Sequence, residues 1–139
     1  MSRTFGFGFV MAALVVLAAC GGPLKYNVPS SRLAPGADAE IVATVSEEKN
    51  QTAVELHAKN LPPPGRVNPN ARAYVAWARK MDNGVWARLG TIKFDEEART
   101  AELMATVPEV AFEIEISAEP DENAASPSAD VVFYQKVQE

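Results

Sequence analysis

From residue 37 onward, apolar and polar positions alternate along the chain with a period of two. This period predicts half-buried β-strands, because successive side chains of a strand point to opposite faces of the sheet. The clearest example is residues 112–116, where Phe112, Ile114 and Ile116 alternate with two glutamates. Seven segments of this kind are separated by turns or loops: residues 39–46, 52–59, 72–80, 85–94, 100–107, 112–116 and 130–137.

The segments between these predicted strands carry residues that favour turns and loops. Asn83-Gly84 tolerates the positive φ angles of a tight hairpin, so it predicts a hairpin between two neighbouring strands. Residues 60–70 contain four prolines, which lack the backbone donor that a central strand needs, and residues 119–128 are rich in small and polar residues. We expect two long loops there. No segment beyond residue 37 has the period of an amphipathic helix.

Short strands without helices predict an all-β domain over residues 37–138. We expect an immunoglobulin-like antiparallel β-sandwich of about seven strands, an architecture that needs about 100 residues. The pattern leaves a small β-barrel open as the alternative. The expected core consists of large apolar residues from one face of each strand: Ile41, Val54, Leu56, Val75, Trp77, Leu103, Phe112, Ile114, Ile116 and Phe133.

The first 19 residues have the pattern of a signal peptide. Arg3 is followed by an uncharged, mostly apolar stretch at residues 5–19. A helix of that length is about 22 Å long, shorter than the roughly 30 Å hydrocarbon core of a bilayer. A short positive region followed by a short apolar region is typical of a secretory signal. We therefore expect residues 1–19 to be a signal peptide helix that is removed on export.

The end of this stretch, Leu17-Ala18-Ala19-Cys20, resembles the lipobox of bacterial lipoproteins. The resemblance implies cleavage by signal peptidase II before Cys20, whose thiol then carries a diacylglycerol with acyl chains such as palmitate. Two or more acyl chains make attachment to a lipid bilayer effectively permanent. Gly21 stands where an aspartate usually signals retention at the inner membrane. The resemblance thus implies a lipid-anchored protein of the cell envelope, at the outer membrane and facing the periplasm.

Residues 20–36 contain three prolines and three glycines and show no regular apolar period. This composition is typical of a flexible linker. We expect a tether that reaches roughly 50 Å when it is largely extended, at about 3.1 Å per residue. In this hypothesis the folded domain begins at residue 37 and is held near the membrane without lying against it.

The segment 60–137 resembles the extracytoplasmic domain of anti-sigma-K factors. The shared elements are a proline-bearing approach, Tyr74-Val75-Ala76-Trp77, Gly84, Leu89-Gly90-Thr91, Phe112, Glu119-Pro120, Ser126-Pro127-Ser128 and Val131-Val132. The resemblance implies a β-sandwich. An anti-sigma factor also needs a cytoplasmic region that binds its sigma factor, whereas only four residues precede the apolar stretch here. Anti-sigma activity is therefore not expected, and an accessory role in envelope regulation is the alternative function that the resemblance suggests.

Composition narrows the functions open to the 139-residue chain. With 13 basic and 18 acidic residues the net charge is −5, and no basic cluster is present, so binding to nucleic acid is not expected. The single cysteine excludes an internal disulfide, and the single histidine, His57, excludes a His-rich metal site. We expect no cofactor and no metal ion. We expect His57 on the polar surface of a strand.

The sequence contains one pair of residues that are candidates for catalysis. The serines lack the context of an activated nucleophile, and Cys20 is expected to carry lipid. Glu113 and Glu115 point to the same face of a predicted strand, about 6.5–7 Å apart, which falls in the range of glycosidase carboxylates. Alternating glutamates are also typical of a solvated sheet face, and we favour that interpretation. A carbohydrate-active enzyme is the less favoured alternative to a non-catalytic protein.

The two tryptophans lead to different predictions. Trp77 stands between alanines in a predicted strand and is expected in the core. Trp86 follows the predicted hairpin turn, and Arg79 and Arg88 flank it. Tryptophan and arginine are enriched where proteins bind one another, so this group predicts a contact with an envelope protein partner. The sequence therefore predicts a lipid-anchored, non-catalytic binding or assembly module.

Overall fold

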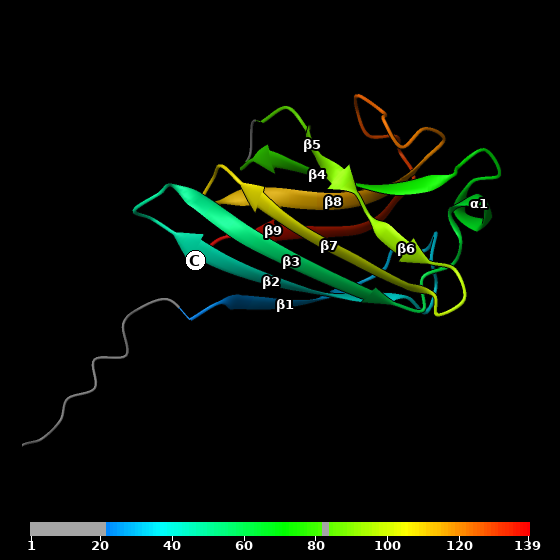
Figure 1. The fold of residues 1–139 in the computed structure, drawn as a ribbon, viewed down its shortest axis with the longest axis horizontal. Coiled ribbons are helices and arrows are strands. Elements are labelled where there is room, and N and C mark those ends of the chain that lie inside the picture. Colours follow the sequence, from blue (N-terminus) through cyan, green and yellow to red (C-terminus); the bar gives the residue numbers. More distant parts are fainter. Residues whose placement is uncertain (1–21, 82–83) are drawn as a thin grey trace, which may run out of the picture.

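The structure, a computed structural model, describes residues 22–81 and 84–139. The predicted signal peptide, Cys20 and two residues of the predicted hairpin turn, Asp82 and Asn83, lie outside the described residues. The described chain forms two antiparallel β-sheets that pack face to face (Figure 1). This arrangement confirms the predicted all-β sandwich, and the strands form two separate sheets rather than one closed barrel.

Each sheet contains strands that are distant in the sequence, and all neighbouring strands are antiparallel. The first sheet has the order β1 (Leu24–Pro29), β2 (Asp38–Ser46), β3 (Gln51–Lys59), β7 (Thr100–Val107) and β6 (Lys93–Asp95). The second has the order β5 (Ala87–Thr91), β4 (Ala73–Lys80), β8 (Phe112–Glu119) and β9 (Val131–Val137). The described residues contain one helix, the short α1 (Pro64–Val67), in the connection between β3 and β4. Neither described range contains a helix with the length and apolar character needed to cross a bilayer.

Each of the predicted strands corresponds to a strand of the structure, but one of them is divided. Residues 85–94 contain β5 and the start of β6, which belong to different sheets. Ile92 lies between the two strands, is buried, and donates its N–H to the carbonyl of Tyr74 over 2.9 Å. The chain therefore crosses from the second sheet to the first at Ile92, a step that a period of two does not indicate.

The prediction of a flexible tether is wrong from residue 24 onward. β1 pairs with β2 along its whole length and buries Val28, which is 2% exposed. Beyond β1, the N–H of Ser31 donates to the carbonyl of Val132 over 2.8 Å, which joins this segment to β9. Prolines and glycines flank the strand on both sides, so the sequence pattern did not indicate a strand there. Pro29 is tolerated because β1 lies at the edge of its sheet, where a missing backbone donor leaves no partner unsatisfied.

The core lies between the inner faces of the two sheets and contains most of the expected residues. Ile41, Leu56 and Phe112 are among its fully buried members. Tyr74 belongs to the core as well: its hydroxyl donates to the carbonyl of Pro62, and its ring meets that of Phe94 edge-on, with the centroids 5.6 Å apart. Burial raises the pKa of Tyr74 well above its usual value. The tyrosine thereby fixes the long loop before β4 to the core.

The prediction that Val75 and Trp77 face the core is wrong. In the register of β4 and β8, Trp77 lies opposite Glu115, whereas Ala76 lies opposite Ile116. This half of β4 is apolar at every position, so an alternating pattern could not show which residues point inward. Trp77 is nevertheless 0% exposed, so the outer face of the second sheet is covered too. The residues of β4 that face the core are Tyr74, Ala76 and Ala78.

Candidate functional site

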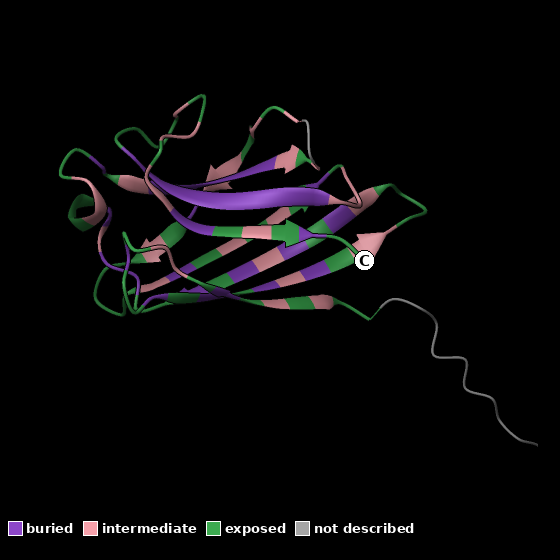
Figure 2. Ribbon diagram, turned by 180° about the vertical axis from the view of Figure 1, so that it is seen from behind, coloured by how far each residue is buried: buried purple, intermediate pink, exposed green. Residues whose placement is uncertain are grey.

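The outer face of the second sheet contains buried charge. Figure 2 shows β8 buried along its whole length, although only one of its faces is turned toward the core. On the other face lie three glutamates, Glu113, Glu115 and Glu119, whose exposed fractions are 3%, 7% and 2%. The prediction of a solvated sheet face for Glu113 and Glu115 is therefore wrong. The alternation of the sequence located the strand, but it did not show that both of its faces are covered.

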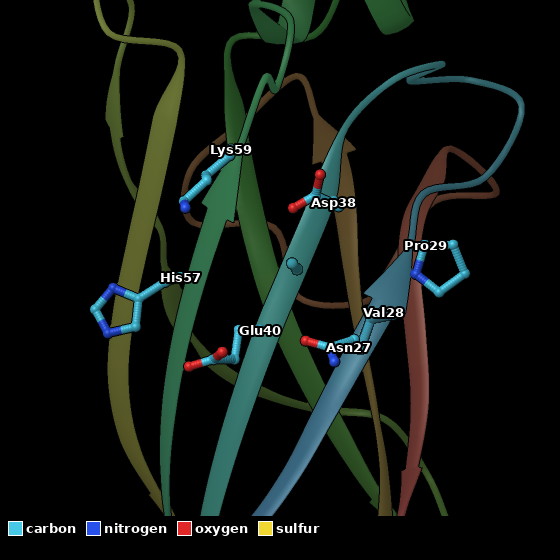
Figure 3. A pocket seen from close by; sticks show the side chains of 8 residues that line it. Asn27, Val28, Pro29, Asp38, Glu40, His57 and Lys59 are labelled. Atoms are coloured by element: carbon cyan, nitrogen blue, oxygen red, sulfur yellow. The ribbon is translucent and has the colours of Figure 1, made fainter.

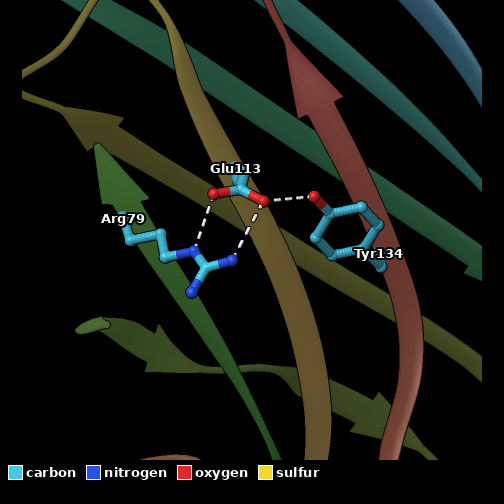
Figure 4. A network of polar contacts seen from close by, with 3 residues as sticks. All are labelled: Arg79, Glu113 and Tyr134. Atoms are coloured by element: carbon cyan, nitrogen blue, oxygen red, sulfur yellow. Dashed lines mark hydrogen bonds and ion pairs between the residues drawn. The ribbon is translucent and has the colours of Figure 1, made fainter. Parts of the chain in front are cut away.

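Glu113 is held between two neighbouring strands (Figure 4). Arg79 of β4 lies directly opposite and donates two hydrogen bonds to its carboxylate, from Nε over 2.7 Å and from Nη2 over 3.1 Å. The hydroxyl of Tyr134 on β9 donates a third. These hydrogen bonds, the arginine's above all, lower the pKa of Glu113 to about 2, and the carboxylate raises the pKa of Arg79. Both members of the pair are therefore charged at neutral pH.

Glu115 follows on the same face of β8, opposite Trp77. Burial raises its pKa, while the nearby guanidinium of Arg79 acts in the opposite direction. Two carboxyls whose pKa values are displaced in opposite directions are also found in acid–base pairs of enzymes. Here, however, both oxygens of Glu113 are occupied by Arg79 and Tyr134, and its side chain is almost fully covered. This arrangement favours a structural role for Glu113.

The third glutamate, Glu119, connects the loop between β8 and β9 to the sheet through hydrogen bonds. Both of its oxygens accept the N–H of Ser128 over 3.0 Å. The hydroxyl of Ser117 donates to the same carboxylate over 3.1 Å and accepts the indole N–H of Trp77 over 2.8 Å. These four residues form one chain of hydrogen bonds from β4 to the loop, and they give the buried indole of Trp77 its partner.

The predicted contact group of Trp86, Arg79 and Arg88 is brought together only in part. The guanidinium carbon of Arg79 lies 4.5 Å from the ring centroid of Trp86, a cation–π geometry. Trp86 is half-buried, and its neighbour Val85 is 90% exposed. Arg88 is held elsewhere, because its Nη2 donates to the carbonyl of Glu122 over 2.6 Å. We refer to Arg79, Val85 and Trp86 as the Trp86 surface.

Glu113 and Tyr134 support the Trp86 surface, and the sequence did not identify them as part of it. Their hydrogen bonds fix the guanidinium on which the indole ring of Trp86 stacks. Arg79 and Glu113 are direct cross-strand partners. Their opposite charges could have suggested an ion pair between Arg79 and Glu113. The register of β4 against β8, which brings the two residues together, cannot be read from a single sequence.

An apolar slot of about 190 Å³ lies next to the Trp86 surface. It is smaller than the roughly 300–1,000 Å³ of typical small-molecule pockets, so its size suits a single side chain of a partner better than a substrate. Its apolar lining consists of Ala78, Val85, Ala87, Leu89, Val107 and Pro108, and the charged residues Arg79, Lys80 and Glu109 complete it.

A second concavity, of about 730 Å³, lies over β1, β2 and β3 (Figure 3). Its exposed polar residues are of mixed charge and include Glu40, His57 and Lys59. The Nε2 atom of His57 lies 2.9 Å from Glu55, and the side chain of His57 is 45% exposed, which confirms its predicted place on the polar surface. Within residues 22–81 and 84–139, no three His, Cys, Asp or Glu side chains are grouped so as to hold a metal ion.

Comparison of the chain with models of protein families, with curated proteins and with solved structures gives no match. Of the two surfaces, the Trp86 surface is the better candidate for binding. Partly buried hydrogen bonds hold the guanidinium of Arg79 in one geometry, whereas Glu40, His57 and Lys59 of the second concavity are exposed. A side chain that is already ordered loses less conformational entropy when a partner binds.

Proposed function

We propose that the protein is a lipid-anchored, non-catalytic binding module of the bacterial cell envelope, attached through Cys20 to the outer membrane and facing the periplasm. The resemblance of residues 17–20 to a lipobox supports the anchor. The observation that carries the binding role is the stacking of Trp86 on Arg79, whose guanidinium is held by Glu113. The partner in this proposal is another protein of the envelope.

The chemistry of the Trp86 surface supports contact with a protein. Binding energy at protein interfaces is concentrated in a few residues, among which tryptophan, tyrosine and arginine are enriched. Trp86 is partly exposed, and Val85 beside it is almost fully exposed. The adjacent slot offers space for an apolar side chain of the partner. Together these features supply an anchor and a pocket, which are the usual parts of an interface centre.

The anchor is tested by mass spectrometry of the protein extracted from envelopes, together with membrane fractionation. We expect Cys20 to carry acyl groups and the protein to sediment with membranes. The Cys20→Ser variant, which has no thiol for thioether formation, should lose the modification. An unmodified Cys20 in a protein that stays in the soluble fraction would contradict the anchor.

The binding role is tested by affinity capture of the intact lipoprotein from crosslinked envelopes. Trp86→Ala removes the ring from the Trp86 surface and should weaken binding of the captured partner by about 30-fold, the effect of losing a hot-spot residue worth about 2 kcal/mol. Met104→Ala is the matched control, because Met104 is 80% exposed on the first sheet. Equal loss in both variants, or recovery of no partner by the unaltered protein, would count against the proposal.

A further inference from the structure

The described chain begins at one end of the sandwich, and the Trp86 surface belongs to the same end. In Figure 1 the start of β1, the turn between β2 and β3 and the C-terminus lie at the left, and the connection from β4 to β5 lies at the top. The register places Lys80 at the end of β4 opposite Phe112, and Phe112 opposite Val137 near the C-terminus. The hydroxyl of Tyr26 donates to the carbonyl of Gln138 over 3.1 Å, which fixes β1 beside the C-terminus. The loops 30–37, 60–72 and 96–99 lie at the opposite end. The loop 120–130 reaches back from that end to β5, where the carbonyl of Glu122 accepts a hydrogen bond from Arg88.

The link between a lipidated Cys20 and this end of the domain is short. Four residue steps separate Cys20 from Leu24, the first residue of β1. A fully extended chain spans at most about 3.6 Å per residue, so the link reaches no more than about 14 Å. β1 cannot lengthen it, because the strand is paired with β2 throughout and Ser31 is hydrogen-bonded to β9. The domain is therefore held close to the bilayer, in contrast to the roughly 50 Å reach of a free tether over residues 20–36.

We propose that this short link positions the Trp86 surface for a protein embedded in or anchored to the same membrane, which presents an apolar side chain to the slot beside Val85. The inference rests on the proposed lipid anchor. The opposite end of the sandwich is the more distant one, since strands of eight residues such as β4 and β8 separate the two ends by roughly 25 Å. A partner in the same membrane therefore meets the anchored end first.

The test combines photocrosslinking with a change in the length of the link. A photoreactive amino acid replaces Val85 in the full chain, and the matched control carries it at Ala98, which is exposed in the turn 96–99 at the opposite end. In envelopes we expect an adduct from position 85 with a protein that stays in the membrane fraction after a high-salt wash. The adduct from position 98 should be at least about tenfold weaker.

Insertion of twelve Gly and Ser residues between Gly22 and Pro23 adds roughly 20 Å of flexible chain. We expect it to weaken the adduct from position 85 by about tenfold or more, while acylation of Cys20 and membrane fractionation stay unchanged. The same insertion between Glu96 and Glu97, in the turn at the opposite end, should leave the adduct at full strength. Thermal melting of each variant establishes that the sandwich is folded.

Three outcomes would overturn the inference while leaving the lipid anchor in place. These are an adduct from position 85 that the insertion after Gly22 does not weaken, an adduct with lipid alone, and a stronger adduct from position 98. Absence of any protein adduct from position 85 would overturn it as well. An unacylated, soluble protein would instead remove the lipid anchor itself and with it the basis of the inference, and mass spectrometry of Cys20 distinguishes that case.

Discussion

At the scale of single residues, the outer face of the second sheet depends on buried polar groups that are paired across strands. Glu113 accepts hydrogen bonds from Arg79 and Tyr134, and Glu119 accepts them from Ser117 and Ser128. Burying a carboxylate costs free energy unless hydrogen bonds and opposite charge replace the water that it loses. These pairs therefore explain how β8 is buried on both faces although every second residue from Glu113 to Glu119 is polar.

The paired state of Glu113 predicts a dependence of stability on pH. Its pKa is about 2 in the folded chain, below the ordinary value of 4.5 that applies when the chain unfolds. The contribution to stability is thus present above about pH 4.5 and is lost as the pH falls toward 2, because the unfolded chain takes up the proton first. Denaturant unfolding at several pH values should show a steeper loss in this window for the unaltered protein than for Glu113→Gln. Glu96→Gln, at an exposed position, should retain the steeper loss.

Tyr74 gives a second prediction at this scale. Tyr74→Phe removes the hydroxyl that donates to the carbonyl of Pro62, while the ring keeps its place in the core. Because the tyrosine is fully buried, the carbonyl loses a partner that water does not readily replace, at a cost of about 1–3 kcal/mol. Tyr26→Phe is the control, since its hydrogen bond to Gln138 is exposed, and its effect should stay within about 0.5 kcal/mol. Equal free energies of unfolding for the two variants would argue against this role of Tyr74.

At the scale of elements, the connection between β4 and β5 determines where Trp86 stands. Gly84 follows the described end of β4 and donates its N–H to the carbonyl of Lys80 over 3.1 Å. A Cβ atom on Gly84 would lie 2.4 Å from the backbone nitrogen of Lys80 and 2.9 Å from its carbonyl oxygen. Only a glycine allows the two backbones to approach so closely. The path of the chain into Trp86 therefore requires glycine at this position.

Gly84→Ala should destabilise the protein by about 1–3 kcal/mol, the usual cost of forcing an extra carbon into a packed site. Gly22→Ala is the matched control, because no atom lies within 4 Å of the Cβ that it would add. Chemical denaturation of both variants measures the difference. If Trp86 also shifts, Gly84→Ala should reduce capture of the partner more than its effect on stability explains, whereas an unchanged midpoint would show that the backbone contact with Lys80 is easily relieved.

At the scale of the whole molecule, β1 joins the two sheets at one edge of the sandwich. It pairs with β2 in the first sheet, while Tyr26 and Ser31 are hydrogen-bonded to residues at and just beyond the two ends of β9. The segment that follows, up to Ala37, includes the fully buried Ala34. The folded domain thus begins near Leu24 and not at residue 37, so only a few residues separate it from Cys20, the proposed site of the lipid anchor.

A chain that begins at Ala37 should therefore be less stable than one that begins at Gly22. The loss should exceed the roughly 1.5–3 kcal/mol that burial of Val28 alone contributes, since the hydrogen bonds of β1 are lost with it. Urea unfolding of the two unlipidated proteins gives the comparison. Identical midpoints would mean that β1 and the turn after it add nothing to the sandwich.

The part of the candidate site that could be predicted from the sequence consists of residues close together in the chain. Trp86 and Arg79 lie close together on either side of one turn, so their proximity follows from a hairpin prediction. Glu113 and Tyr134 come from strands that are distant in the sequence, and Arg88 was predicted to join the group although the loop between β8 and β9 holds it elsewhere. Contacts across strands depend on register, which a single sequence does not contain.

The sequence by itself determined the strands between residues 38 and 137, except for the division of residues 85–94 into β5 and β6, and it determined the all-β class and the polar surface position of His57, because each follows from local periodicity and charge. Only the tertiary structure decided that Trp77 faces away from the core, that Glu113 and Glu115 are buried, and that residues 24–29 form a strand. The physical reason is that a period of two shows where a strand runs, whereas burial depends on what packs against each face. In the second sheet β8 and most of β4 are buried on both faces, and β1 is stabilised by its neighbours more than by its own composition.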